Sequence, residues 1–179
     1  MVIACLGWGS LIWKPGDLPL RCEWFFDGPR LPVEFCRVGD GGELATALCM
    51  NATPSQVLWS VLDVPDLDTA CQALRVREQI PEQRDDGVGL YVPARNDQGV
   101  LADWALERGV DALVWTALPP RIDNQEGRLP SRKQAIDYLQ GLQGETREHA
   151  RDYLARVPEQ IATPWRREVM RALDLNSGA

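Results

Sequence analysis

The sequence predicts an α+β fold, with most strands in the first part of the chain and helices in its last third. Three observations support this. Residues 2–6 form a short, wholly apolar run, which is typical of a strand buried on both faces. Residues 40–42 read Asp-Gly-Gly between two apolar runs, which predicts a hairpin turn. From residue 131 onward, apolar side chains recur at the spacing of amphipathic helices.

The first 64 residues are expected to contain four or five consecutive strands, mostly antiparallel. Glycine and proline residues separate a series of apolar or aromatic runs, and each run has the length and composition of a strand. Lys14, Pro15 and Gly16 exclude a helix directly after the first run. The expected strands cover residues 2–6, 22–27, 31–38, 44–49 and 57–64.

The middle of the chain alternates predicted helices and strands. A helix is expected over residues 66–80, with Asp66 or Asp68 as its N-cap. A second helix over residues 99–108 ends at Gly109, because glycine commonly terminates helices. Strands are expected at residues 87–93 and 112–118, and the polar stretch 121–129 is expected to be a loop or a lid.

Three helices are predicted in the last third of the chain. Ser131 and Gln134 form a capping box at the start of the first. The second covers residues 145–157, and the third begins at Thr163, an N-cap followed by proline. We see no repeat, low-complexity tract or domain boundary, so the sequence predicts a single domain over residues 1–179.

Composition and charge argue against several classes of function. The net charge is −7 and the isoelectric point is about 4.8, whereas binding to nucleic acid or to anionic membrane requires a clustered basic surface. No apolar run is long enough to span a bilayer, and we expect no secretion signal because no basic leader is present. Five scattered cysteines, an odd number, predict free thiols in a reducing cytoplasm. The single histidine, His149, is far from every cysteine in the sequence, which argues against zinc.

A Gly-Trp-Gly-Ser turn at residues 7–10 directly follows the first predicted strand. Glycine tolerates positive φ and lets a ligand approach the main chain, and successive peptide N–H groups can hold a carboxylate. A dinucleotide-binding fingerprint would need glycine where Ile12 stands, and a hydrolase elbow would need another spacing of glycine and serine. Taken alone, the turn is also compatible with a tight strand exit that binds nothing.

Glu78 is the second candidate functional residue. The apolar residues of the predicted helix 66–80 share one face, and Glu78 lies eleven residues after Leu67 and seven after Cys71. At about 100° per residue, both spacings place Glu78 within about 20° of the apolar face, so a buried carboxylate is predicted. Judged from periodicity alone, a surface glutamate paired with a neighbouring arginine is at least as compatible with the pattern.

Residues 8–16 read Trp-Gly-Ser-Leu-Ile-Trp-Lys-Pro-Gly, and residues 74–78 read Leu-Arg-Val-Arg-Glu. The first segment resembles the Tyr-Gly-Ser-Leu-Ile-Trp-Lys-Pro-Gly start of the γ-glutamylcyclotransferase superfamily, with Trp8 where the family has Tyr. The second is similar to the Leu-Arg-x-Arg-Glu segment that carries the catalytic glutamate of the ChaC-like, glutathione-degrading branch. Residues 29–35 are similar to the family's Arg-Leu-x-Phe strand, and the likeness is best over the first eighty or so residues.

The resemblance implies a small mixed β-barrel flanked by helices. It implies that the main-chain groups of Trp8, Gly9, Ser10 and Leu11 hold the head of a γ-glutamyl substrate, possibly glutathione. Glu78 would remove a proton from the substrate α-ammonium group, the amine would attack its own γ-carbonyl to form 5-oxoproline, and Glu78 would return the proton to the leaving amine. The implied partner is this small molecule, and no metal or organic cofactor is implied.

Two other functions are compatible with the sequence. The same fold could be a catalytically inactive module that binds a small molecule or a partner, which the replacement of the family Tyr by Trp8 favours. A related enzyme could use water as the acceptor at the γ-carbonyl and release glutamate instead of 5-oxoproline.

Overall fold

A computed structural model describes residues 1–176, and the chain divides into two compact units. Unit 1 contains Met1–Gly7, Leu11–Arg30 and Gln56–Leu118. Unit 2 contains Trp8–Ser10, Leu31–Ser55 and the described residues from Pro119 onward. The prediction of a single domain over residues 1–179 stays a prediction.

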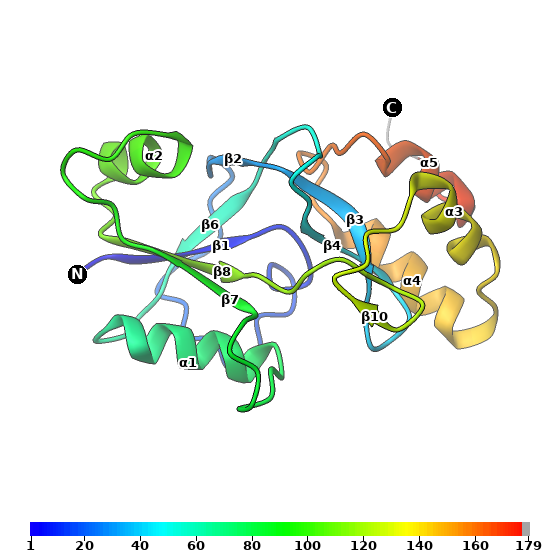
Figure 1. Cartoon of the computed structure of the whole chain (residues 1–179), viewed down its shortest axis with the longest axis horizontal. Coiled ribbons are helices and arrows are strands. Elements are labelled where there is room, and N and C mark those ends of the chain that lie inside the picture. The colour runs from blue at the N-terminus through cyan, green and yellow to red at the C-terminus, as the bar shows by residue number, and fades with distance from the viewer. Residues whose placement is uncertain (177–179) are drawn as a thin grey trace. The chain divides into compact units, whose positions relative to one another are not determined.

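Unit 1 is built on a four-stranded mixed sheet with the strand order β6-β1-β8-β7 (Figure 1). The central strand β1 pairs antiparallel with β6 and parallel with β8, and β7 pairs antiparallel with β8. All five residues of β1 are buried, as the apolar run at residues 2–6 predicts. The four strands are β1 (Ile3–Gly7), β6 (Leu58–Val61), β7 (Val88–Tyr91) and β8 (Ala112–Thr116).

Two helices belong to unit 1, α1 (Leu67–Arg77) and α2 (Val100–Arg108). The Asp66 side chain accepts a hydrogen bond from the Thr69 N–H at 2.8 Å, which confirms it as the N-cap of α1. Ala70 and Leu74 on α1 join a core cluster with Ile3 and Cys5 of β1 and with apolar residues of β8. The predicted helix 66–80 therefore exists, and its apolar stripe packs against the sheet.

The sheet of unit 2 has the strand order β10-β9-β3-β4. Its longest pair, β3 (Val33–Val38) and β4 (Leu44–Leu48), is antiparallel, and Gly42 occupies the connecting turn with φ of 86°, so the predicted hairpin is confirmed. Three helices complete the unit: α3 (Arg132–Gln140), α4 (Gly144–Arg156) and α5 (Arg166–Ala172). The capping box of Ser131 and Gln134 at the start of α3 is confirmed.

The mixed α and β class is confirmed, with five helices in residues 1–176, but the expected small barrel is not formed. Closing a barrel requires the two edge strands of a sheet to pair with each other. In the described residues, β6 and β7 are the ends of one open sheet, and β10 and β4 are the ends of the other. The remaining strands, β2 (Arg30–Leu31) and β5 (Ser55–Gln56), form a separate two-stranded sheet.

Two predictions about strand and loop segments were wrong. Residues 22–27 are not a strand, because the segment makes a single bridge between Phe25 and Trp59, and the rest of it is irregular. The stretch 121–129 is not simply a loop, because it contains the hairpin of β9 (Arg121–Ile122) and β10 (Gln125–Glu126). Arg121 pairs with Glu126 within the hairpin at 3.2 Å, and Arg37 of β3 pairs with Glu126 at 2.9 Å, which holds the hairpin to β3.

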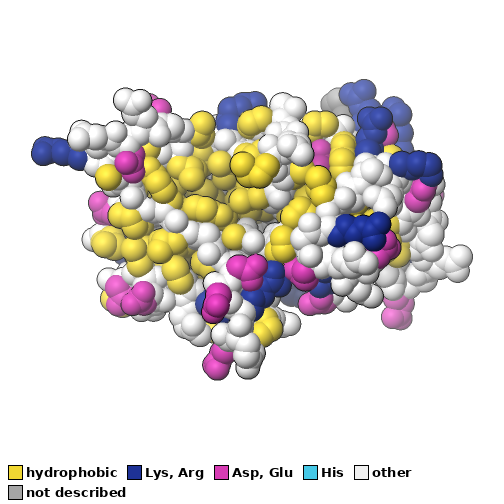
Figure 2. Space-filling model, viewed as in Figure 1, with side chains coloured by type: hydrophobic (Ala, Val, Ile, Leu, Met, Phe, Trp, Pro, Cys, Tyr) yellow, Lys and Arg dark blue, Asp and Glu magenta, His cyan; other side chains and the backbone are white. Residues whose placement is uncertain are grey.

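The surface of unit 1 carries exposed apolar side chains. Figure 2 shows apolar side chains gathered around α2 and β7, where Leu90, Val92, Val100 and Leu106 are exposed. Among the helices of residues 1–176, none is both long enough and apolar enough to cross a membrane.

All five cysteines are free thiols, as predicted.

Candidate functional site

Glu78 lies at the C-terminal end of α1, where it forms the C-cap of the helix. Its backbone N–H still donates to the Leu74 carbonyl at 2.9 Å, so the side chain keeps the direction set by the last helical turn. That side chain is 14% exposed, and Leu74, one turn earlier, is completely buried. The carboxylate therefore lies at the end of the buried stripe, mostly shielded from solvent.

Two side chains bind the same oxygen of the Glu78 carboxylate. The Arg77 Nη1 is 3.1 Å from Glu78 Oε1, and the Thr116 hydroxyl donates to Oε1 at 3.2 Å. Thr116 is the last residue of β8, which pairs with β1, so the central part of the sheet positions it. Within residues 1–176, Oε2 accepts no hydrogen bond. One oxygen is thus held in place while the other is left for a further donor.

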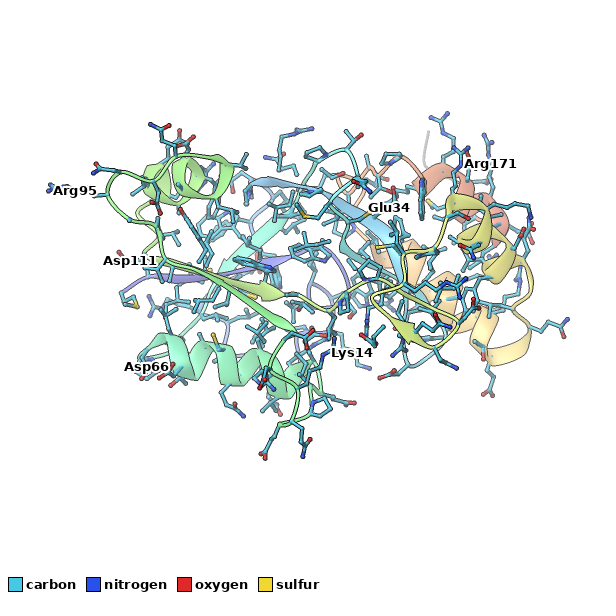
Figure 3. The ribbon with its side chains drawn as sticks, in the orientation of Figure 1. Lys14, Glu34, Asp66, Arg95, Asp111 and Arg171 are labelled. Atoms are coloured by element: carbon cyan, nitrogen blue, oxygen red, sulfur yellow. The ribbon has the colours of Figure 1, made fainter. Side chains whose placement is uncertain are left out.

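Arg77 connects the end of α1 to the loop that follows the first turn of the chain. Its Nε and Nη2 donate to the Lys14 carbonyl at 3.1 and 2.6 Å, and its side chain is 14% exposed. Figure 3 labels Lys14 in this loop. Bonds from a guanidinium to a carbonyl and to a carboxylate restrict the side chain to one orientation, so Arg77 fixes Glu78 against the loop.

The charge of Glu78 acts on the Cys5 thiol of β1. Burial raises the pKa of the Cys5 thiol far above its usual range, the negative charge of Glu78 raises it further, and Arg77 partly opposes the effect. The thiol is therefore neutral at physiological pH, and it donates weakly to the Leu6 carbonyl. Cys5 contributes apolar packing beside Glu78 and has no thiolate with which to attack a substrate.

The four predicted substrate-binding residues divide between the two units. Leu11 belongs to unit 1, where its side chain is 4% exposed and packs in the core cluster around β1. Trp8, Gly9 and Ser10 belong to unit 2. The Trp8 side chain is 5% exposed, so its indole is a buried packing group.

The main chain of the turn rests on two hydroxyl groups of unit 2. The Thr46 hydroxyl donates to the Trp8 carbonyl at 2.8 Å, and the Tyr153 hydroxyl is 3.0 Å from Thr46 Oγ1. A Cβ atom placed on Gly9 would lie 2.5 Å from the Tyr153 hydroxyl and 2.7 Å from Thr46 Oγ1. Gly7 and Gly9 do not adopt positive φ, so close packing is what requires glycine at position 9.

Glu34 is a second buried carboxylate, and it belongs to unit 2 on β3 (Figure 3). Its Oε1 accepts hydrogen bonds from the Phe35 N–H and the Thr163 hydroxyl, and its Oε2 accepts one from the Trp165 N–H at 3.3 Å. Burial raises the pKa of the Glu34 carboxyl group. Glu34 is 2% exposed and accepts hydrogen bonds from three donors, so its role is to stabilise the fold of unit 2.

A pocket of about 530 Å³ lies on the outer side of α1 and the loop that follows it. Arg75 and Arg84 line it, but Arg75 donates to the Pro81 and Arg84 carbonyls, and Arg84 pairs with Asp86. Glu78 does not line this pocket. Both arginines of the pocket are already bonded to groups of the protein, so we assign no ligand to this pocket.

The sequence did not predict which residues contact Glu78 and the turn at residues 7–10. Arg77 stands in the quoted motif, but its bonds to Lys14 were not foreseen. Thr116 reaches Glu78 from a residue 38 positions away, and Tyr153 reaches Thr46 from 107 positions away. Contacts of this kind depend on how elements pack, and no local pattern in the sequence signals them.

Comparison of the chain with protein-family models, with curated proteins and with solved structures finds no match.

Proposed function

We propose that this protein is a γ-glutamylcyclotransferase-like enzyme that releases 5-oxoproline from a γ-glutamyl peptide or amine, glutathione being one candidate. The observation that carries the proposal is the state of Glu78. Its side chain is 14% exposed, Arg77 and Thr116 anchor Oε1, and Oε2 accepts no hydrogen bond from residues 1–176. A carboxylate held by one oxygen can exchange a proton through the other without losing its position.

The proposed reaction uses one carboxylate twice. Glu78 takes a proton from the α-ammonium group of the substrate, and the freed amine attacks the γ-carbonyl carbon to form a five-membered ring. The bond between the γ-carbonyl carbon and the leaving nitrogen then breaks, and the proton held by Glu78 goes to that nitrogen. The ring nitrogen loses its second proton to water, and the released amine takes up a proton from water, which gives 5-oxoproline and a protonated amine. The attack is intramolecular, so holding the substrate in a folded conformation supplies much of the rate.

We further propose that main-chain groups of Trp8, Gly9, Ser10 and Leu11 bind the glutamyl head. Peptide N–H groups are suited to a carboxylate or to the oxyanion that develops at the γ-carbonyl. The proposal includes the γ-glutamylcyclotransferase-like fold and a cytoplasmic location. The mixed sheet of unit 1 and the helical end of the chain support the α+β class of that fold, whereas the sheets of the described residues are open and not closed into its barrel.

The first experiment is to incubate the protein with glutathione and a panel of γ-glutamyl dipeptides and to measure 5-oxoproline. We expect release by the wild type and a loss of about 10²- to 10⁴-fold in kcat/KM for Glu78→Gln, which cannot accept the proton. Glu82→Gln is the matched control, because it removes an exposed carboxylate four residues away and should leave the rate unchanged.

No 5-oxoproline from any substrate, or an undiminished rate in Glu78→Gln, would refute the proposal. Glutamate as the product would select hydrolysis of the γ-glutamyl bond. The catalytically inactive binding module, which Trp8 in place of the family Tyr favours, would be selected if a γ-glutamyl compound raised the melting temperature without being converted.

A further inference from the structure

A directed chain of hydrogen bonds ends on the Trp8 carbonyl. Thr46 Oγ1 is 2.8 Å from that carbonyl oxygen, which can only accept, so the Thr46 hydroxyl proton points to it. The contact of 3.0 Å between the two hydroxyls is therefore donated by Tyr153. The Tyr153 oxygen in turn accepts from the Thr46 N–H at 3.0 Å, so α4 and β4 hold both hydroxyls in one arrangement.

Anchoring this carbonyl determines where the next peptide N–H points. The peptide bonds of the described chain are all trans, and in a trans peptide the C=O and the N–H point in opposite directions. The N–H of Gly9 is therefore turned away from Thr46 and Tyr153. Gly9 is buried, and within residues 1–176 its N–H donates no hydrogen bond.

A buried peptide N–H without an acceptor is uncommon, because leaving such a group unpaired costs about 1–3 kcal/mol. Here the packing also holds the peptide in place, since a Cβ on Gly9 would lie 2.5 Å from the Tyr153 hydroxyl. A hydrogen bond donated to the carbonyl of a peptide polarises its N–H and strengthens the bond that this N–H can donate. The result is a fixed, polarised donor that has no acceptor within the described chain.

We propose that Thr46 and Tyr153 are positioning residues that orient the Trp8–Gly9 peptide so that the Gly9 N–H binds the α-carboxylate of a γ-glutamyl substrate. The identity of this ligand rests on the proposed function. Neither hydroxyl touches the substrate, and both act through the peptide that they hold. Losing either hydroxyl leaves the turn in place but lets the peptide plane rotate, which weakens substrate binding more than it slows the chemical step.

The kinetic experiment compares Thr46→Val and Tyr153→Phe with the wild type on γ-glutamyl substrates. Each variant loses one hydroxyl with little change in shape. We expect KM to rise about 10-fold, the equivalent of one hydrogen bond, while kcat stays within about twofold. Thr46→Ser keeps the hydroxyl and should restore the wild-type KM.

Tyr138→Phe is the matched control for general loss of stability. Tyr138 is a half-buried tyrosine of unit 2 whose hydroxyl donates to the Gly42 carbonyl at 2.7 Å, far along the chain from the turn. It should lower the melting temperature about as much as Tyr153→Phe without changing KM. A wild-type KM in Thr46→Val, or an equal rise of KM in Tyr138→Phe, would overturn the positioning role while leaving the role of Glu78 intact.

A second measurement does not depend on turnover. The amide resonance of Gly9 is followed by NMR while γ-glutamylglycine is added, and we expect it to shift in the wild type and to shift less in Thr46→Val. If the wild type released no 5-oxoproline, the proposed function would be wrong, and this titration alone would decide the inference. A Gly9 resonance that does not respond to millimolar γ-glutamylglycine would overturn it.

Discussion

Gly9 is the residue whose replacement tests the packing of the first turn most directly. Its Cα lies against Tyr153 and Thr46, and an added methyl group would meet their hydroxyl oxygens at 2.5 and 2.7 Å. Either the turn or both buried side chains must move, so Gly9→Ala should lower the free energy of unfolding by about 1–3 kcal/mol. Urea denaturation followed by circular dichroism measures this change.

Gly141→Ala is the control for that substitution. Gly141 caps α3 with a right-handed φ of −81°, and an added Cβ would meet no heavy atom closer than 3.5 Å. This variant should be neutral or more stable by about 0.4–1 kcal/mol, because alanine restricts the unfolded chain. Equal stability losses in Gly9→Ala and Gly141→Ala would contradict the close packing at the turn.

Among the elements, α5 begins in a way that its sequence did not predict. Thr163 was expected to be its N-cap, but the helix starts at Arg166 with Trp165 as the N-cap residue. The Thr163 hydroxyl donates to Glu34 on β3, and the Trp165 N–H donates to the other oxygen of the same carboxylate. Glu34 thus does the capping from another element, because its Oε2 accepts the Trp165 N–H in place of an N-cap side chain.

Glu34→Gln should destabilise the protein in a pH-dependent way. Burial raises the pKa of Glu34 in the folded state above its unfolded value. The contribution of Glu34 to stability is therefore fully present below the unfolded pKa and is lost as the pH rises through the folded pKa. Gln cannot titrate, and its amide leaves at least one donor unpaired, so the variant should lose about 1–3 kcal/mol at low pH.

The stability difference between wild type and Glu34→Gln should shrink as the pH rises above about 4.3, the ordinary pKa of glutamate. Denaturation curves at a series of pH values measure it, with Glu82→Gln as the exposed control that should show a much smaller pH dependence. A difference that grows with pH would show that Glu34 is stabilised as the charged form.

At the scale of the whole molecule, the reactivity of the five cysteine thiols measures how well each of the two units is packed. Cys5, Cys36 and Cys49 are buried, and Cys22 and Cys71 are half-buried. Burial raises the pKa of the thiols of Cys5 and Cys36, so they have almost no thiolate at neutral pH.

Under native conditions, we expect a disulfide reagent such as DTNB to react only with the half-buried thiols, slowly at Cys71 because burial also raises its pKa, and in denaturant with all five. Cys22→Ser and Cys71→Ser should each remove one equivalent from the native reaction. Prompt reaction of all five thiols in the native protein would contradict the packing of β1 and of the β3–β4 pair.

Much of the fold could be predicted because its signals are local. The buried strand at residues 2–6, the Asp66 cap, the stop at Gly109 and the capping box of Ser131 each depend on residues a few positions apart. The open sheets were not predicted, since strand order and closure depend on which distant segments pair. Residues 22–27 illustrate this. Their sequence predicts a strand, but only Phe25 pairs with β6, through a single bridge to Trp59.

The sequence by itself determined the class of fold and the periodic burial of α1, because helix phase follows directly from residue spacing. The Leu-Arg-Val-Arg-Glu segment at residues 74–78, together with that phase, selected Glu78 as a candidate. Only the tertiary structure decided what surrounds these residues. Thr116 and Arg77 meet on one oxygen of Glu78, and Tyr153 and Thr46 meet under the turn at Gly9. These contacts join residues that are far apart in the chain. They form because both partners are buried together in the folded protein, and no local sequence pattern encodes such contacts.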